Sequence, residues 1–121
     1  MLLGEKERLL ALFADRQRWC QHAEARDEVG QIVHYDDPSA VAWDITGGMC
    51  LLFGWRRALE LFPQLDRHVH RVKRSRWWVT DPGIASMGAL QDSNDDTGTT
   101  FEMMTGWLKS MPVWNGHRQR F

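Results

Sequence analysis

Apolar residues recur every three or four positions in several stretches of this chain, which is the pattern of amphipathic helices. The first stretch runs from about Glu5 to Trp19, where Leu10 and Phe13 fall on one side and neighbouring leucines widen the stripe. Acidic residues near its start and basic residues near its end match the charges that the helix dipole favours. We therefore predict a helix over residues 5–19.

The segment over residues 20–37 is polar at first and becomes apolar only over residues 31–35. It predicts a loop that could include one short strand over residues 31–35. Asp37 followed by Pro38 is a strong signal for a helix start, because aspartate accepts a free backbone N–H and proline fits the first turn. We therefore predict that a second helix begins at Asp37.

Two adjacent glycines, Gly47 and Gly48, fall inside this second helix. Each costs roughly 1 kcal/mol relative to alanine in a helix interior, so the pair needs a reason. We expect another helix or a tryptophan ring to approach the backbone there more closely than a Cβ atom would permit.

A third helical stretch follows Gly54, and we expect it to stop or kink at Pro63, because proline lacks the N–H that an interior position donates. The next predicted helix buries Leu65 and Val69 and carries many basic residues. The tryptophans fall into two groups according to their expected burial. Trp43, Trp55 and Trp107 fall on inward faces, so we expect them in the core. Trp77, Trp78 and Trp114 lie beside turns or the tail, where we expect a partly exposed indole.

Residues 80–98 are rich in glycine, serine and aspartate and predict the main loop of the protein. Thr99 and Glu102 match a capping box, in which the hydroxyl and the carboxylate each accept a free N–H at a helix start. The last predicted helix begins there and ends at Pro112.

These elements predict an all-α fold, a compact single domain of four to five short helices over residues 1–112, followed by a C-terminal tail over residues 113–121. A length of 121 residues suits one domain. Seven tryptophans and five phenylalanines provide ample surface for its core.

Charged residues enter the chain after only two leucines, so we expect neither a signal peptide nor a membrane span. Cys20 and Cys50 lie far apart in a chain that does not need a disulfide for its stability, which favours reduced thiols. The sequence therefore predicts a cytoplasmic protein.

The formal net charge of −1 hides an uneven distribution. Residues 55–78 hold seven Lys or Arg and only two Asp or Glu, and residues 67–80 hold no acidic residue. Arginine forms bidentate contacts with carboxylate or phosphate, and exposed tryptophan is a common interface anchor. The basic segment over residues 67–78, which ends in two tryptophans, is therefore the leading candidate for a functional surface.

This surface has three readings. It could be solvated or paired within the molecule, it could bind an acidic protein partner or a second copy of the chain, or it could bind a nucleotide or nucleic acid. The net charge lacks the basic excess of a nucleic-acid binder, which makes the last reading less favourable. We predict a non-catalytic binding module, and its partner-binding residues are Arg67, Arg71, Arg74, Arg76, Trp77 and Trp78.

A small enzyme is the alternative class, and the best candidates for its nucleophile and base are Cys20 and His22. Residues two apart on a helix point about 200° away from each other, so direct pairing would need an extended backbone. Asp27 and His34 are the only other candidates nearby. Asp66 and His70 have helical i,i+4 spacing, but a lone pair is more often a surface hydrogen bond than a metal site. We predict no catalytic residue, no cofactor and no metal.

Three local patterns carry a resemblance to a known family. They are Trp19-Cys20-Gln21 with Ala23, Ala25 and Asp27; Ala40-x-x-Trp43 followed by Gly47-Gly48; and Asn94-Asp95 with Thr99-Thr100. Together they resemble a bacterial and phage family of small tryptophan-containing domains of unknown function, over about residues 5–110. Asp44 departs from the cysteine or apolar residue expected there, and the basic stretch over residues 67–76 is particular to this chain. The resemblance implies a single helical domain and no mechanism.

Overall fold

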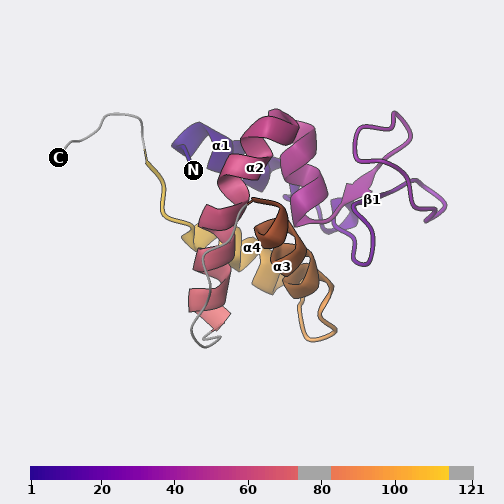
Figure 1. The fold of residues 1–121 in the computed structure, drawn as a ribbon. Coiled ribbons are helices and arrows are strands. Elements are labelled where there is room, and N and C mark those ends of the chain that lie inside the picture. The colour runs from indigo at the N-terminus through magenta and orange to yellow at the C-terminus, as the bar shows by residue number, and fades with distance from the viewer. Residues whose placement is uncertain (74–82, 115–121) are drawn as a thin grey trace.

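The computed structural model describes residues 1–73 and 83–114 (Figure 1). This part of the chain contains four α-helices, one short 3₁₀ helix and a sheet of two short antiparallel strands, so the predicted all-α class is confirmed. The elements are α1 (Leu3–Leu12), η1 (Arg16–Arg18), β1 (Ala25–Arg26), β2 (Ala42–Trp43), α2 (Ile45–Lys73), α3 (Gly83–Asp95) and α4 (Phe101–Ser110).

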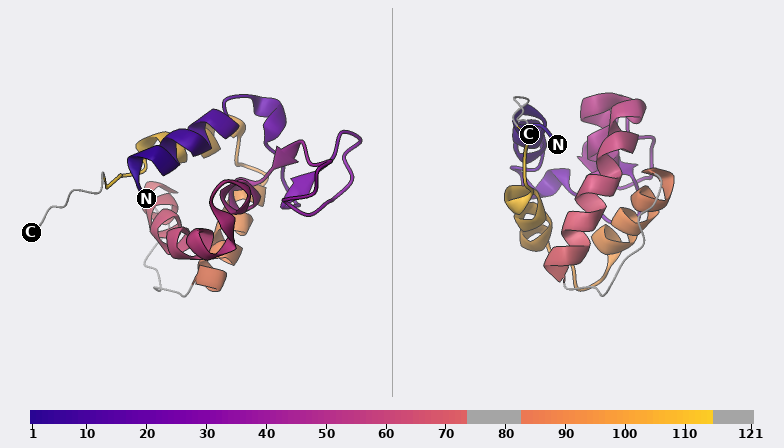
Figure 2. Two further views of the ribbon diagram at one scale, coloured as in Figure 1. Left: turned by 90° about the horizontal axis from the view of Figure 1, so that it is seen from above. Right: turned by 60° about the vertical axis from the view of Figure 1, so that its left-hand side comes forward.

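Helix α2 is the centre of the fold, because it packs against α1, α3 and α4, and α1 also packs against α4 (Figure 2). The core is formed by the apolar faces of these helices. Its fully buried large side chains are Leu9, Phe13, Ile45, Met49, Leu61, Phe62, Leu65, Val69, Leu90, Met104 and Leu108. The inward orientation predicted for Trp43 and Trp107 is confirmed, whereas Trp55 is 42% exposed, so its predicted core position was wrong.

The break in α2 lies at Gly54, where we expected one helical stretch to end and the next to begin, whereas our prediction of a second break, at Pro63, was wrong. Gly54 has φ 82° and ψ 160°, a conformation that is essentially restricted to glycine. Pro63 lies inside the helix and keeps helical torsions there. Proline removes one backbone hydrogen bond, but its fixed φ is compatible with a helix, so packing of the buried residues around it holds the helix together.

The start of α2 differs from the prediction by several residues. Asp37 forms a local turn in which the Ser39 N–H donates to its carboxylate at 2.8 Å. The helix cap is Asp44, whose carboxylate accepts from the Gly47 N–H at 2.6 Å. The two residues before Asp44 form β2, which pairs with β1, and this pairing keeps the chain extended until Asp44. The short strand considered over residues 31–35 is reduced to one isolated bridge, between Ile32 and Arg26.

The close approach predicted at the two glycines of α2 is confirmed, and the approaching groups are the Glu24 backbone and the ring of Phe13 at the end of α1, not a tryptophan ring. A Cβ atom on Gly47 would lie 2.0 Å from the carbonyl oxygen of Glu24, and one on Gly48 would lie 2.8 Å from the ring of Phe13. The first contact is with backbone and the second with a phenylalanine ring. The absence of side chains thus allows the 19–26 segment and α1 to lie directly against α2.

Helix α3 occupies most of the segment that we predicted as a loop, so that prediction was wrong. Its buried positions are Ser86, Leu90, Ser93 and Asn94, which have helical spacing. Three of these four are small or polar, and the stripe therefore does not stand out as an apolar pattern. The cap of α4 is also shifted by one residue from the prediction, because Thr100, not Thr99, accepts from the Met103 N–H, at 3.1 Å.

The first helix is shorter than predicted, since α1 ends at Leu12 and residues 16–18 form a separate 3₁₀ turn capped by Asp15. At the other end of the chain, the Trp114 N–H donates to the Met1 carbonyl at 2.9 Å. Residues 113 and 114, which we had assigned to the tail, therefore lie beside the start of α1 (Figure 2). No helix in the described ranges is long and apolar enough to cross a bilayer.

Candidate functional site

The described part of the predicted partner-binding surface is the last part of α2. Arg67 and Arg71 are both exposed there. They stand four residues apart, so their side chains leave the helix on the same side. The other members of the predicted set, Arg74, Arg76, Trp77 and Trp78, lie outside the described residues.

A pocket of about 280 Å³ adjoins these two arginines. Helix α2 forms one wall, and Met1 with the segment after α4 forms the other. The lining residues are Met1, Gln64, Arg67, His68, Arg71, Met111, Pro112, Val113 and Trp114. Trp114 is 54% exposed, in agreement with its predicted position in the tail. Prediction from sequence missed this pocket, because its two walls are about 45 residues apart in the chain.

Two described arginines, Arg16 and Arg57, are neutralised by carboxylates, whereas Arg67 and Arg71, like Arg18 and Arg56, have no ion pair with a described carboxylate. Arg16 pairs with Glu102, and Arg57 pairs with Glu5 and Glu60. Within residues 1–73 and 83–114, no carboxylate forms an ion pair with Arg67 or Arg71. Their charges are therefore not compensated by the described part of the molecule.

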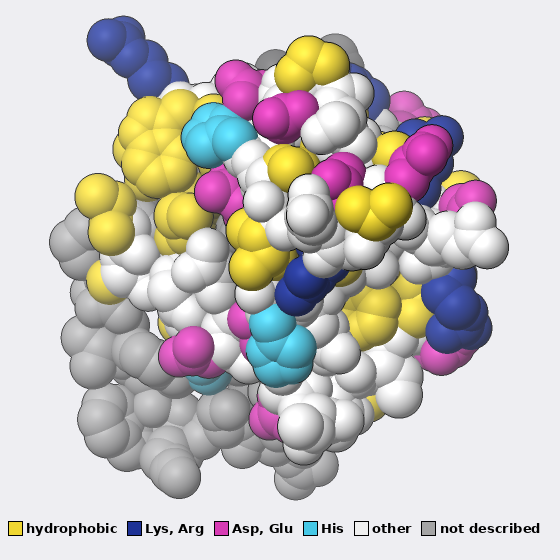
Figure 3. Space-filling model, turned by 90° about the vertical axis from the view of Figure 1, so that its right-hand side faces the viewer, with side chains coloured by type: hydrophobic (Ala, Val, Ile, Leu, Met, Phe, Trp, Pro, Cys, Tyr) yellow, Lys and Arg dark blue, Asp and Glu magenta, His cyan; other side chains and the backbone are white. Residues whose placement is uncertain are grey.

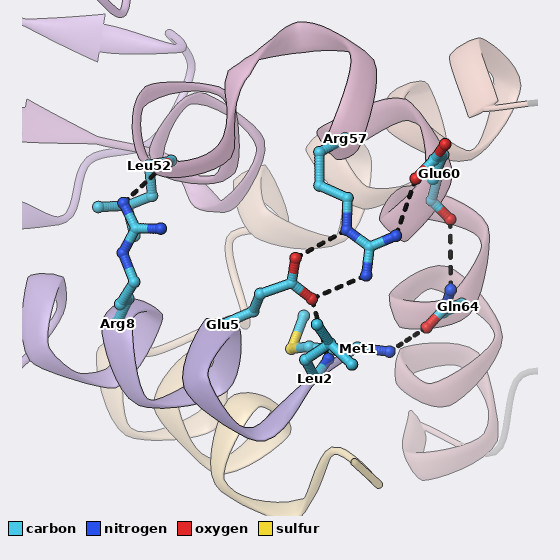
Figure 4. Close-up of polar contacts among 8 residues, drawn as sticks. All are labelled: Met1, Leu2, Glu5, Arg8, Leu52, Arg57, Glu60 and Gln64. Carbon is cyan, nitrogen blue, oxygen red and sulfur yellow. Dashed lines mark hydrogen bonds and ion pairs between the residues drawn. The ribbon is translucent and has the colours of Figure 1, made fainter. Parts of the chain in front are cut away.

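A network of polar contacts holds Met1, on one side of the pocket, against Gln64 of α2 on the other (Figure 4). The Glu5 carboxylate accepts two hydrogen bonds from the Arg57 guanidinium, at 2.7 and 2.9 Å, and one from the Leu2 N–H at 2.9 Å. The hydrogen bond from Arg57 holds the pKa of Glu5 below its ordinary value. Because these contacts join α1 to α2, the wall is held in position by side chains outside the pocket.

His68 lies in the floor of the pocket and is only 8% exposed. Its Nε2 faces the Ser110 hydroxyl at 2.9 Å, and its Nδ1 is buried without a hydrogen-bond partner in the described residues. Burial lowers the pKa of His68, and the nearby charges of Arg71 and Lys6 lower it further. A neutral imidazole is therefore favoured, and the cationic groups of the pocket are the side chains of Arg67 and Arg71 and the Met1 ammonium, which donates to Gln64.

The residues of the enzyme alternative are engaged in other contacts. Burial raises the pKa of Cys20 to about 12, and the charge of Asp44 raises it further, whereas a nucleophilic cysteine needs a lowered pKa. The Cys20 thiol faces the Ala23 carbonyl at 3.5 Å. Asp27 accepts hydrogen bonds from the backbone N–H groups of its own turn, and His34 contacts Asp36.

Asp66 and His70 do approach each other, with 2.6 Å between a carboxylate oxygen and Nδ1. In the described ranges, no group of three or more His, Cys, Asp or Glu side chains is arranged to hold a metal ion.

On the face of the molecule that carries β1, acidic and basic side chains are interspersed among apolar ones (Figure 3). That face therefore offers no alternative basic surface among the side chains drawn in colour.

No family model, curated protein or solved structure matches this chain. Three residues of the first local pattern, Trp19, Cys20 and Gln21, lie around the fully buried Asn94. Its Oδ1 accepts from the Trp19 indole at 2.7 Å and from the Ile45 N–H at 3.2 Å, and its Nδ2 donates to the Cys20 carbonyl at 3.1 Å. Gln21 donates to the Asn94 carbonyl at 2.8 Å. These motif residues thus join three segments of the fold, which is a structural role.

Asp44 gives the protein a specific pH dependence. Burial raises its pKa from 3.8 to about 6, so the folded state binds this proton more tightly than the unfolded state. The stability that this proton binding provides is present below about pH 4 and is lost as the pH rises through about 6. Asparagine also caps helices well. We expect the free energy of unfolding of the wild type to fall by about 2 kcal/mol between pH 4 and 7 because of Asp44, and Asp44→Asn should remove this fall. Urea unfolding of both proteins at several pH values measures this pH dependence, and parallel stability profiles of the two proteins would contradict the prediction.

Proposed function

We propose that this chain is a non-catalytic binding module that binds an acidic segment of a partner protein through the basic end of α2. The observation that carries the proposal is the state of Arg67 and Arg71. Both are exposed, they point to the same side of α2, and no described carboxylate neutralises them. A guanidinium binds a carboxylate with two parallel hydrogen bonds, which gives both affinity and orientation.

The sequence adds to this support, because residues 67–80 contain basic but no acidic side chains. We place the interaction in the cytoplasm, since the two cysteines are not paired with each other. The raised pKa of Cys20 disfavours the enzyme alternative. We also retain family membership as a proposal, on the motif residues that meet around Asn94.

Double charge reversal tests the proposed surface. Arg67→Glu with Arg71→Glu should weaken the binding of a fluorescein-labelled peptide of alternating Glu and Leu by at least about tenfold, because two attractive contacts become repulsive. Fluorescence anisotropy at physiological salt measures the affinity. The matched control is Arg18→Glu with Arg56→Glu, which changes the net charge equally at two exposed arginines outside the pocket.

The control variant should bind within about twofold of the wild type. Equal losses in both variants would show that net charge alone attracts the peptide, and the proposal would fail. Tighter binding of a single-stranded oligonucleotide, with a steep loss on adding salt, would favour a nucleic-acid binder instead. A concentration-dependent dimer that the reversal at residues 67 and 71 dissociates would identify a second copy as the partner.

A further inference from the structure

The pocket beside Arg67 and Arg71 has two chemically different walls. The α2 wall contributes the two guanidinium groups and the amide of Gln64. The opposite wall contributes Met1 and residues 111–114, which are all apolar in their side chains except for the indole N–H of Trp114. This lining suits a ligand that is anionic toward α2 and apolar toward residues 111–114.

The spacing of the two arginines suits one carboxylate on the anionic side of the ligand. Side chains four residues apart on a helix leave it about 6 Å from each other, so both guanidinium groups can reach one carboxylate. Nearby described carboxylates do not take this place. Glu60 pairs with Arg57, and Asp66 pairs with His70 inside the helix packing.

The charge of Lys6, on the facing helix, is used elsewhere. Its ammonium group donates to the carbonyl oxygens of Lys109 and Met111, at 2.6 and 2.9 Å, and so caps the end of α4. This contact fixes the beginning of the 111–114 wall relative to α1. The network of Glu5, Arg57 and Gln64 fixes Met1 on the same side. The pocket is thus preformed, which reduces the entropic cost of binding.

The apolar side is accessible where the ligand would need it. Trp114 is 54% exposed and Val113 is 39% exposed, whereas Met111 is buried beneath them. Such a surface suits one apolar side chain that packs on the indole. A cavity of about 280 Å³ has room for one or two peptide side chains.

We infer that this pocket binds one acidic residue of a peptide, with its carboxylate between Arg67 and Arg71 and the adjacent apolar residue of the peptide on Trp114 and Val113. The inference rests on the proposed function and specifies its recognition element. A charged surface alone would select any acidic segment, whereas the pocket selects an acidic residue that has an apolar neighbour.

The test uses two short peptides, acetyl-Phe-Glu-Phe-amide and its matched control acetyl-Phe-Gln-Phe-amide, in an NMR titration of the full chain labelled with ¹⁵N. The glutamate peptide should give saturable shifts of the Trp114 indole and of the Arg67 and Arg71 Nε–H signals. The glutamine peptide should bind at least about tenfold more weakly, because it lacks the charge that the arginines bind. Equal binding of the two peptides, or shifts at other residues only, would overturn the inference.

Two substitutions separate the pocket from the charged surface. Trp114→Ala should weaken the binding of the glutamate peptide by about tenfold. Trp114→Phe should keep most of the affinity, because an aromatic ring remains for the apolar side chain of the peptide. The same spectra show whether each variant is folded. If Trp114→Ala has no effect while the double reversal at Arg67 and Arg71 abolishes binding of the longer acidic peptide, the pocket inference fails and the proposed function stands.

Two further outcomes overturn the inference in different ways. If inorganic phosphate or uridine monophosphate shifts the same signals and the glutamate peptide does not, the pocket is an anion site of another class. If neither the tripeptide nor the longer acidic peptide binds, the proposed function fails together with the inference.

Discussion

Gly47→Ala is expected to lower the free energy of unfolding by about 3 kcal/mol or more, one of the two largest effects that the structure predicts for a single substitution. The added Cβ would lie 2.0 Å from the carbonyl oxygen and 2.9 Å from the carbonyl carbon of Glu24. Both atoms belong to the backbone, so no rotamer change relieves the overlap. The 24–26 segment would have to move away from α2, and its hydrogen bonds to β2 and Asp44 would break.

Alanine at Gly88 and at Gly106 gives the matched controls for this experiment. Both glycines lie inside helices, and nothing lies within 4 Å of an added Cβ at either position. Each alanine should therefore stabilise the protein by up to about 1 kcal/mol through helix propensity. Urea unfolding followed by circular dichroism measures all three variants. A Gly47→Ala midpoint equal to that of the wild type would mean that the close approach of Glu24 to α2 does not exist in solution.

Asn94→Ala is expected to lower the free energy of unfolding by about 3–5 kcal/mol, because buried hydrogen bonds are lost. The side chain is completely buried and forms four hydrogen bonds, among them those with the Trp19 indole and the Cys20 carbonyl. Alanine would leave these partners buried without hydrogen bonds, and each such group costs roughly 1–3 kcal/mol. Chemical unfolding measures the loss. The exposed Asp92 on the same helix is the control, and its replacement by alanine should change stability by less than about 0.5 kcal/mol.

Asn94→Asp distinguishes the hydrogen-bond network from simple packing, because it preserves the volume. It keeps an acceptor for the Trp19 indole but places a carboxylate oxygen against the Cys20 carbonyl and the Asp95 carboxylate. The variant should therefore be destabilised at neutral pH and should recover part of its stability as the pH falls and the new carboxyl group is protonated. Equal destabilisation by Asn94→Asp at all pH values would argue that packing dominates.

The sequence predicted the helical class, because most buried faces of this protein follow a clear apolar period. Helix α4 is the best example, since Met104, Trp107 and Leu108 are inward as expected. The pattern also justified the two glycines of α2. In α4 the physical cause, burial of an apolar stripe, acts on residues that are near each other in the chain. At the two glycines the helix-propensity cost alone indicated a close approach, and the approaching groups, Glu24 and Phe13, lie far away in the chain.

The predictions failed where a distant segment decides the local structure. Asp37 and Asp44 are equally good caps from their chemistry, and only the pairing of β2 with β1 selects Asp44. Helix α3 was missed because serines and an asparagine form much of its buried face. Asn94 is stable there because its side chain bonds to partners from other segments, for instance the Trp19 indole at 2.7 Å.

The candidate site was predicted in part. Charge patterning located the basic end of α2, since Arg67 and Arg71 are exposed there. It did not locate the apolar wall, because no local pattern links Met1 and Trp114 to a helix that lies far from both in the sequence. Trp114 was expected to be partly exposed, and the partner it lies against became visible only in three dimensions.

The break at Gly54 makes this position selective for chirality and not for size. An added Cβ at Gly54 would meet no atom within 4 Å, so there is room for a side chain. The obstacle is the positive φ of 82°, which disfavours every L-amino acid whatever its volume. An amino acid of the opposite hand adopts these torsions without strain, so a D-alanine at this position of a chemically synthesised chain is compatible with the bend in α2, whereas its mirror image is not.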